Sequence, residues 1–282
     1  MSLSKLLMQY ARSGRLILWP AIVLTTLASA THLGLNLQNG AIIALCLSLA
    51  STFGFVLNDL HDIETDRVNG ARRLQSTQKS ERKQLRILNK AVAFFSLLLS
   101  TAVDARLFFG MVCILLALVA YTFWARKILW VANILCCLVS ASPLWLPILV
   151  SAQHSSFIIL WTATAFAILF AREIAFDARD LAGDAASHRK TVATKYGRKA
   201  ALKTAASCYM MALALPAIHL LSHAGAEYPL IYSLATLSLM ALSLIAVREL
   251  VSISRARKAG FAIFVSTTRA VMILTALAVF VY

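Results

Sequence analysis

Two short segments of this 282-residue chain concentrate side chains that could bind a metal ion. Residues 58–66 and 172–184 together hold eight of its 12 acidic residues. The groups of interest are Asn58, Asp59, Asp62 and Asp66 in the first segment and Asp177, Asp180 and Asp184 in the second. Most of them recur every three or four positions, so on a helix they share one face. Because stacked carboxylates repel one another, and repel more strongly near a membrane, we expect a cation at these segments.

Magnesium fits this set of ligands. It prefers oxygen atoms, keeps several waters, and typically binds through one or two carboxylates together with substrate phosphates. Two facing segments would hold magnesium ions that bridge to a diphosphate, and nearby Arg and Lys would neutralise the remaining phosphate charge. We expect direct metal contacts from Asn58, Asp62, Asp180 and Asp184, with Asp62 and Asp180 as catalytic residues, and further or water-mediated contacts from Asp59, Asp66 and Asp177.

Two alternative roles for these acidic segments stay open. The acids could pair with basic loop residues as a solvated network at a membrane edge. They could also serve a calcium or magnesium transporter. A transporter would place its acids near the bilayer midplane, whereas both segments lie at the ends of apolar runs.

The residues around the two segments are those of a membrane protein. The chain is 60% hydrophobic and 14% charged, whereas a soluble domain carries about 25% charged residues. A membrane-spanning helix needs about 20 mostly apolar residues. Nine ranges approach that requirement: 16–36, 41–57, 89–104, 107–124, 129–151, 156–176, 203–222, 228–247 and 261–281. The composition predicts an all-α, polytopic membrane protein, a single domain over residues 1–282 with about nine transmembrane helices.

The basic residues predict how these helices are oriented. All but Arg106 and Arg269 of the 27 Lys and Arg lie in the N-terminal segment or around the loops that follow the second, fourth, sixth and eighth ranges. Basic loops are cytoplasmic, so we expect the N-terminus and both acidic segments on the cytoplasmic side and the C-terminus on the opposite side. The net charge of +15 then reflects topology, with the lipid bilayer as the surroundings, and neither nucleic acid nor an obligate protein partner is expected.

The acidic segments resemble those of the UbiA superfamily of intramembrane prenyltransferases. Residues 58–66 match its N-D-x-x-D-x-x-x-D motif at all four defined positions. The second segment resembles the stretch R-E-I-x-x-D-x-x-D-x-x-G-D-x-x-x-G-x-x-T, matched by Arg172, Glu173, Ile174, Asp177, Asp180, Gly183, Asp184 and Thr191. Weaker matches to a Tyr, a basic residue and an Asn of the family are Tyr121, Lys127 and Asn133.

The chain departs from the family pattern at two places. Where the family often has Arg-Pro-Leu after the first motif, this chain has Arg72-Arg73-Leu74 in a segment without proline. His188 stands where the second motif usually has Gly. These changes leave the proposed metal ligands intact and affect the loops around them.

The resemblance implies a helical bundle around a central cavity, with the two acidic helices facing each other at its cytoplasmic mouth. It implies a magnesium-dependent transferase that binds a prenyl diphosphate and a small-molecule acceptor and releases pyrophosphate. We expect diphosphate contacts from Arg73, Lys127, Lys190, Tyr121 and Asn133. A dense basic rim at the cavity mouth favours an anionic acceptor, and family chemistry an aromatic one. The rim includes Arg72, Arg73, Arg126, Lys127, Arg189 and Lys190. A terpene cyclase on the same scaffold, which needs no acceptor, is the alternative, and a non-catalytic membrane binding or transport protein is the third hypothesis.

Overall fold

The computed structural model describes residues 3–68, 74, 77–151 and 153–222, together with isolated positions between 241 and 273. Every regular element in these ranges is a helix. The elements are α1 (Leu3–Ser13), η1 (Leu16–Leu18), α2 (Trp19–His32), α3 (Leu37–His61), α4 (Ile63–Val68), α5 (Lys79–Ser100), α6 (Ala105–Phe123), η2 (Ala125–Lys127), α7 (Val131–Ser140), α8 (Ser142–Ser151), α9 (Ser156–Arg179), α10 (Leu181–Ala186), α11 (Val192–Tyr196) and α12 (Arg198–Ser222). The all-α prediction is confirmed.

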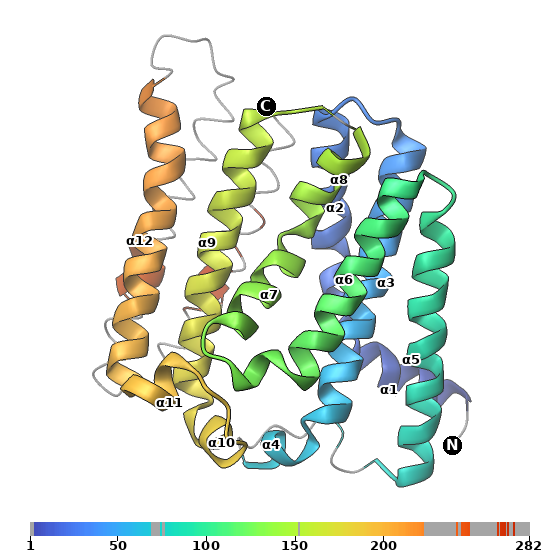
Figure 1. The fold of residues 1–282 in the computed structure, drawn as a ribbon, viewed down its shortest axis with the longest axis vertical. Helices are drawn as coiled ribbons and strands as arrows, with labels where there is room; N and C mark the ends of the chain where they lie inside the picture. Colours follow the sequence, from blue (N-terminus) through green and yellow to red (C-terminus); the bar gives the residue numbers. More distant parts are fainter. Residues whose placement is uncertain are drawn as a thin grey trace.

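Long apolar helices run side by side through the bundle (Figure 1). Four helices in the described ranges, α3, α6, α9 and α12, are long and apolar enough to cross a membrane. Two bent pairs, α1 with η1–α2 and α7 with α8, raise that number to six if each pair is one span. The chain is therefore an integral membrane protein. The predicted number of nine is not confirmed: α5, which covers the predicted range 89–104, is not among these candidates, and the ranges 228–247 and 261–281 lie mostly outside the described residues.

Helix α5 begins ten residues before the predicted range 89–104. Its first turn is closed by Glu81, whose Oε2 accepts a hydrogen bond of 3.0 Å from the backbone N–H of Gln78. Hydropathy misses this half of the helix because it is rich in Lys, Arg and Gln. The next helix begins where Asp104, at its N-cap, accepts a hydrogen bond from the backbone N–H of Leu107, which resolves the boundary near Asp104–Arg106.

Helix α9 forms the centre of the larger of the buried clusters. It packs against α12, α7, α8 and α11. Alanines are frequent on the buried surfaces of α9 and α12, and they include Ala165, Ala171, Ala175, Ala201 and Ala205. Small residues let membrane helices approach closely, so that backbone packing stabilises the pair. This contact fixes the position of the second acidic segment, which lies at the C-terminal end of α9.

A second cluster fixes the first acidic segment. Helix α3 packs against α2, α5, α6 and α8, and the buried side chains of this cluster include Ile43 of α3, Leu107 and Met111 of α6, and Leu146 of α8. At Gly54 a side chain would lie 2.5 Å from a methyl carbon of Leu118 on α6, so the absence of Cβ allows these two helices to approach. Both acidic segments thus extend from helices that are held by packing rather than by loops.

Candidate metal and anion site

Both acidic segments contain the same break in the helix. Helix α3 ends at His61, and after Asp62 the chain continues as α4. Helix α9 ends at Arg179, and after Asp180 the chain continues as α10. Asp62 and Asp180 have the same backbone angles, φ −93° and ψ 13°. Each segment therefore passes from a long helix into a short one at an aspartate, and the prediction of one continuous helix through each segment is wrong.

The two breaks bring the acidic segments together at one end of the bundle. Helices α4 and α10 lie against each other there (Figure 1). The hydroxyl oxygens of Thr65 and Ser187 are 2.7 Å apart across this contact. As the sequence suggested, segments more than 100 residues apart in the chain face each other.

Asp62 is the carboxylate at the centre of this contact. It is 4% exposed, and its Oδ1 accepts hydrogen bonds of 2.5 Å from both Arg126 Nη1 and Arg189 Nη2. His61 Nδ1 lies 3.1 Å from the same oxygen. Burial alone would raise the pKa of Asp62, but the two guanidinium groups hold it below the ordinary value for an aspartate. Asp62 is therefore ionised, and its charge is compensated from two other parts of the chain.

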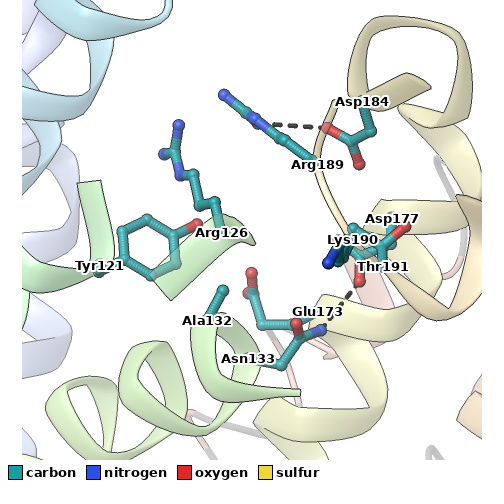
Figure 2. Close-up of a pocket in the computed structure, with 10 residues that line it drawn as sticks. All are labelled: Tyr121, Arg126, Ala132, Asn133, Glu173, Asp177, Asp184, Arg189, Lys190 and Thr191. Atoms are coloured by element: carbon teal, nitrogen blue, oxygen red, sulfur yellow. Dashed lines mark hydrogen bonds and ion pairs between the residues drawn. The ribbon is translucent and has the colours of Figure 1, made fainter. Parts of the chain in front are cut away.

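A polar pocket is lined by Arg126 and Arg189, the two partners of this carboxylate (Figure 2). It has an empty volume of about 350 Å³, including space open to solvent. Its walls are Tyr121, Arg126, Ala132, Asn133, Glu173, Asp177, Asp184, Arg189, Lys190 and Thr191. Three cationic and three acidic side chains thus face one small volume. Such a site can bind an anion and a divalent cation together, because each ion compensates one set of protein charges.

Hydrogen bonds between the pocket residues fix their positions. Asn133 Nδ2 donates to Asp177 Oδ2 at 2.9 Å, and Arg189 Nη1 donates to Asp184 Oδ1 at 3.2 Å. The guanidinium carbon of Arg126 lies 4.7 Å from the ring centre of Tyr121. Burial raises the pKa of Asp184 to about 6, although the neighbouring Arg189 favours the ionised form. A nearby cation would favour ionised Asp184 further.

The residues present fit a magnesium ion. Asn58 Oδ1 is buried and has no hydrogen-bond partner among the described residues, and an orphaned oxygen of this kind is a suitable ligand for a hard cation. The described residues contain no group of three or more acidic, His or Cys side chains arranged to hold a metal by themselves. A magnesium ion here would therefore need oxygens from a second ligand, as it does when it is shared with substrate phosphates.

The other predicted metal ligands lie in different surroundings. Both oxygens of Asp59 are engaged near the N-terminus, Oδ2 by the Ser13 hydroxyl at 2.8 Å and Oδ1 by Arg15 at 3.1 Å. Asp180 accepts two hydrogen bonds from Arg179, at 2.8 and 2.7 Å. Asp66 is half-buried on α4. Of the seven, Asp177 and Asp184 line the pocket, and Asp62 joins it through Arg126 and Arg189.

The predicted diphosphate contacts separate into three groups. Tyr121, Asn133 and Lys190 line the pocket. Lys127 is exposed and does not line it, whereas its neighbour Arg126 is buried and does. Arg73 lies outside the described residues.

Three pocket residues were not predicted from the sequence as metal or diphosphate contacts: Arg126, Arg189 and Glu173. The only signal for the two arginines was their place in the basic rim, and Glu173 appeared only as one position of the second acidic motif. Which member of an adjacent basic pair points inward depends on the turn η2, which a linear pattern does not specify.

His188, which stands where the family motif usually has Gly, adopts a backbone conformation that favours glycine. Its φ is +54°, in the left-handed region that glycine adopts without steric cost. The reversal after α10 brings the backbone N–H of Arg189 to within 2.9 Å of the carbonyl oxygen of Asp184. Position 188 therefore requires a positive φ whichever residue occupies it, and here a histidine takes it.

The comparisons with known proteins agree with this architecture. The model of the UbiA prenyltransferase family matches residues 17–268. No curated protein matches the chain. A solved structure described as a digeranylgeranylglyceryl phosphate synthase in membranes is 20% identical with a TM-score of 0.70, and the match covers 98% of both chains.

Two archaeal structures are similar as well. A UbiA homolog from Archaeoglobus fulgidus bound to DMAPP and Mg2+ is 17% identical with a TM-score of 0.69 over 96% of this chain and 99% of that one. The apo structure of a UbiA homolog from Aeropyrum pernix K1 is 15% identical with a TM-score of 0.73 over 92% and 96% of the two chains. The family match extends over most of the sequence, so this chain belongs to the UbiA prenyltransferase family.

Replacing His188 by Gly should stabilise the protein. A left-handed conformation costs an L-residue about 1–2 kcal/mol, and the larger chain entropy of glycine offsets only about 0.5–1 kcal/mol of that gain. Ala186→Gly, two residues earlier in helix α10, should instead destabilise by about 1 kcal/mol. Thermal unfolding of the two purified variants in detergent measures both changes. Midpoints that shift in the same direction would contradict this role of position 188.

Proposed function

We propose that this member of the UbiA prenyltransferase family transfers a prenyl group from an isoprenoid diphosphate to a small acceptor within the membrane and releases pyrophosphate. The observation that carries the proposal is the contact between Asp62 of the first acidic segment and Arg189, which follows the second. That contact joins carboxylates and guanidinium groups from opposite halves of the chain around one pocket. A magnesium diphosphate needs both kinds of group at once.

The proposed metal ligands are Asn58, Asp62, Asp66, Asp177, Asp180 and Asp184. Magnesium, when bound with the diphosphate, would withdraw electron density from its oxygens and stabilise it as a leaving group. Asp59 was expected to contribute as a further ligand. Since Ser13 and Arg15 engage both of its oxygens, we assign it instead to anchoring the N-terminal helix beside the site.

Arg126, Arg189 and Lys190 are the proposed contacts to the phosphate oxygens. All three line the pocket, and Arg126 is held over the ring of Tyr121. As the allylic carbon–oxygen bond breaks, its electron pair passes to the diphosphate, and these fixed cations stabilise the growing negative charge without reorganising. The acceptor then supplies the electron pair for the new bond to the allylic carbon and loses a proton. The apolar surfaces of the bundle would keep water from capturing the allylic cation first.

The charges of the pocket also bear on the acceptor. Arg126 and Arg189 are paired with carboxylates, whereas Lys190, at the exposed edge of the pocket, forms no ion pair with a described residue and leaves a positive field there. An anionic acceptor, with a carboxylate or phosphate, would be attracted by this field. From the positive-inside rule we propose that this pocket and the N-terminus lie on the cytoplasmic side.

The proposed function is tested with purified protein, magnesium, and geranyl, farnesyl or geranylgeranyl diphosphate, each with and without candidate acceptors. We expect pyrophosphate release that depends on an anionic acceptor and yields a prenylated conjugate, detected by mass spectrometry. Efficient formation of a cyclic hydrocarbon or terpene alcohol without an acceptor would favour a terpene cyclase instead. Absence of any product with every pair would contradict both.

Asp62→Asn and Asp180→Asn should each lower the turnover number by at least roughly 10²-fold, the scale of losing a charge-stabilising catalytic group. The double variant should be little worse than either single variant, because groups that act as a unit are not additive. Glu64→Gln is the matched control, since Glu64 lies in the same segment with its side chain 85% exposed. The rate of pyrophosphate release measures these effects. Wild-type turnover in excess chelator would rule out the magnesium site.

Arg126→Gln and Lys127→Gln remove the same charge from adjacent positions with different burial. Arg126 is 7% exposed and lines the pocket, so its loss should weaken magnesium pyrophosphate binding by about 10–100-fold, the equivalent of one charge-assisted hydrogen bond. Lys127→Gln should stay within about threefold of wild type, because an exposed charge is screened by solvent. Isothermal titration calorimetry on the two variants makes the comparison. A larger loss of pyrophosphate binding in Lys127→Gln than in Arg126→Gln would show that Lys127, not Arg126, is the phosphate contact.

A further inference from the structure

The first half of α5 carries a row of cations that do not line the pocket. Lys79, Lys83, Arg86 and Lys90 are all exposed, and none of them lines the pocket. At ~100° per residue they fall within an arc of roughly 60° on the helix surface. We call these four residues the α5 basic stripe. Among the described residues no acidic side chain forms an ion pair with any of them, although Glu81 of the same helix pairs with Lys5.

Helix α1 shows at which depth of the membrane the stripe lies. It is bent by 54° from the segment that follows, and it exposes Leu7 and Met8, each about half accessible. Its other face contains the polar residue Gln9 and the buried Tyr10. A helix that leaves the direction of a membrane span and exposes apolar side chains in this way lies at the boundary between headgroups and acyl chains.

Hydrogen bonds place the stripe at the level of α1. The amide of Gln9 donates to the Thr77 hydroxyl at 2.6 Å, and the Tyr10 hydroxyl donates to Asn89 Oδ1 at 2.8 Å. These contacts reach residues 77 and 89, which enclose the stripe except for Lys90, the residue next to Asn89. The four cations are therefore beside the lipid headgroups.

The surface of α5 changes character directly after the stripe. Phe94, Phe95 and Leu98 are 62%, 60% and 53% exposed, and the other residues from Ala91 to Ser100 are apolar or small. Exposed apolar side chains at this depth contact acyl chains. Along α5, a basic surface that can contact headgroup phosphates is thus followed by an apolar surface that can contact acyl chains.

We propose that the α5 basic stripe is a binding surface for anionic phospholipids. The stripe supplies cations that form no ion pair with a described residue, and clusters of Lys and Arg next to a membrane-embedded helix attract anionic headgroups. The exposed apolar residues that follow contact the acyl chains of the same lipids. The surface is separate from the pocket, so lipid binding there does not depend on the proposed function.

The test compares two triple variants of equal charge by native mass spectrometry. Lys83→Gln/Arg86→Gln/Lys90→Gln removes most of the stripe, and Lys195→Gln/Lys199→Gln/Lys203→Gln removes three exposed lysines elsewhere. We expect wild type to retain phosphatidylglycerol in preference to phosphatidylcholine of the same acyl chains. The stripe variant should bind phosphatidylglycerol roughly tenfold or more weakly, and the control variant should bind it as wild type does.

A second measurement guards against loss of folding. Because the three substituted side chains are exposed and make no ion pairs with described residues, the stripe variant should unfold at the wild-type temperature in detergent alone. Added phosphatidylglycerol should raise that temperature for wild type and the control variant but not for the stripe variant. Equal binding of both lipids by wild type, equal losses in the two variants, displacement of the lipid by inorganic phosphate, or unfolding of the stripe variant without lipid would each overturn the proposal. An acidic protein that binds the stripe in place of the lipid would overturn it too.

Discussion

The arrangement of this end of the molecule depends on the compensation of one buried negative charge. A carboxylate taken out of water is costly unless it is paired and hydrogen-bonded. Asp62 meets that condition only because Arg126, after α6, and Arg189, after α10, both reach it. Three separate parts of the chain must therefore be in place together. The hydrophobic clusters around α3 and α9 hold the helices, and the charge of Asp62 determines how their ends meet.

The two acidic segments are related in structure as well as in composition. Each passes from a long apolar helix into a short one through an aspartate with the same backbone angles. In both, the backbone N–H four residues after that aspartate bonds to its carbonyl oxygen, at 2.7 Å for Asp66 and 3.0 Å for Asp184. Residues at equivalent positions of the two segments thus converge on one region from opposite sides. A cation shared between them would be approached by similar backbone geometry on each side.

Hydropathy predicted the long apolar helices, because burial in lipid requires long apolar runs. The regular spacing of the aspartates and the family motifs predicted that the two acidic segments meet. They did not predict the polar first half of α5, whose turns are stabilised by Glu81 and by packing against α1 rather than by apolar composition. They also missed the breaks at Asp62 and Asp180, since local periodicity continues unchanged through both. Arg126, and not Lys127, points into the pocket because of the turn η2 and the contact with the ring of Tyr121. Contacts of this kind between distant residues have no local pattern.

The partners of helix α1 have a consequence for how the protein is made. Lys5 and Tyr10 bond to Glu81 and Asn89, which are 76 and 79 residues further along the chain. At a synthesis rate of about 5–20 residues per second, the ribosome needs roughly 4–16 seconds to make that intervening length. Throughout that interval α1 lacks both of these partners. The contact of α1 with α5 can therefore form only after residue 89 has been made, whereas Asp59, whose carboxylate contacts Ser13 and Arg15, is made 30 residues earlier.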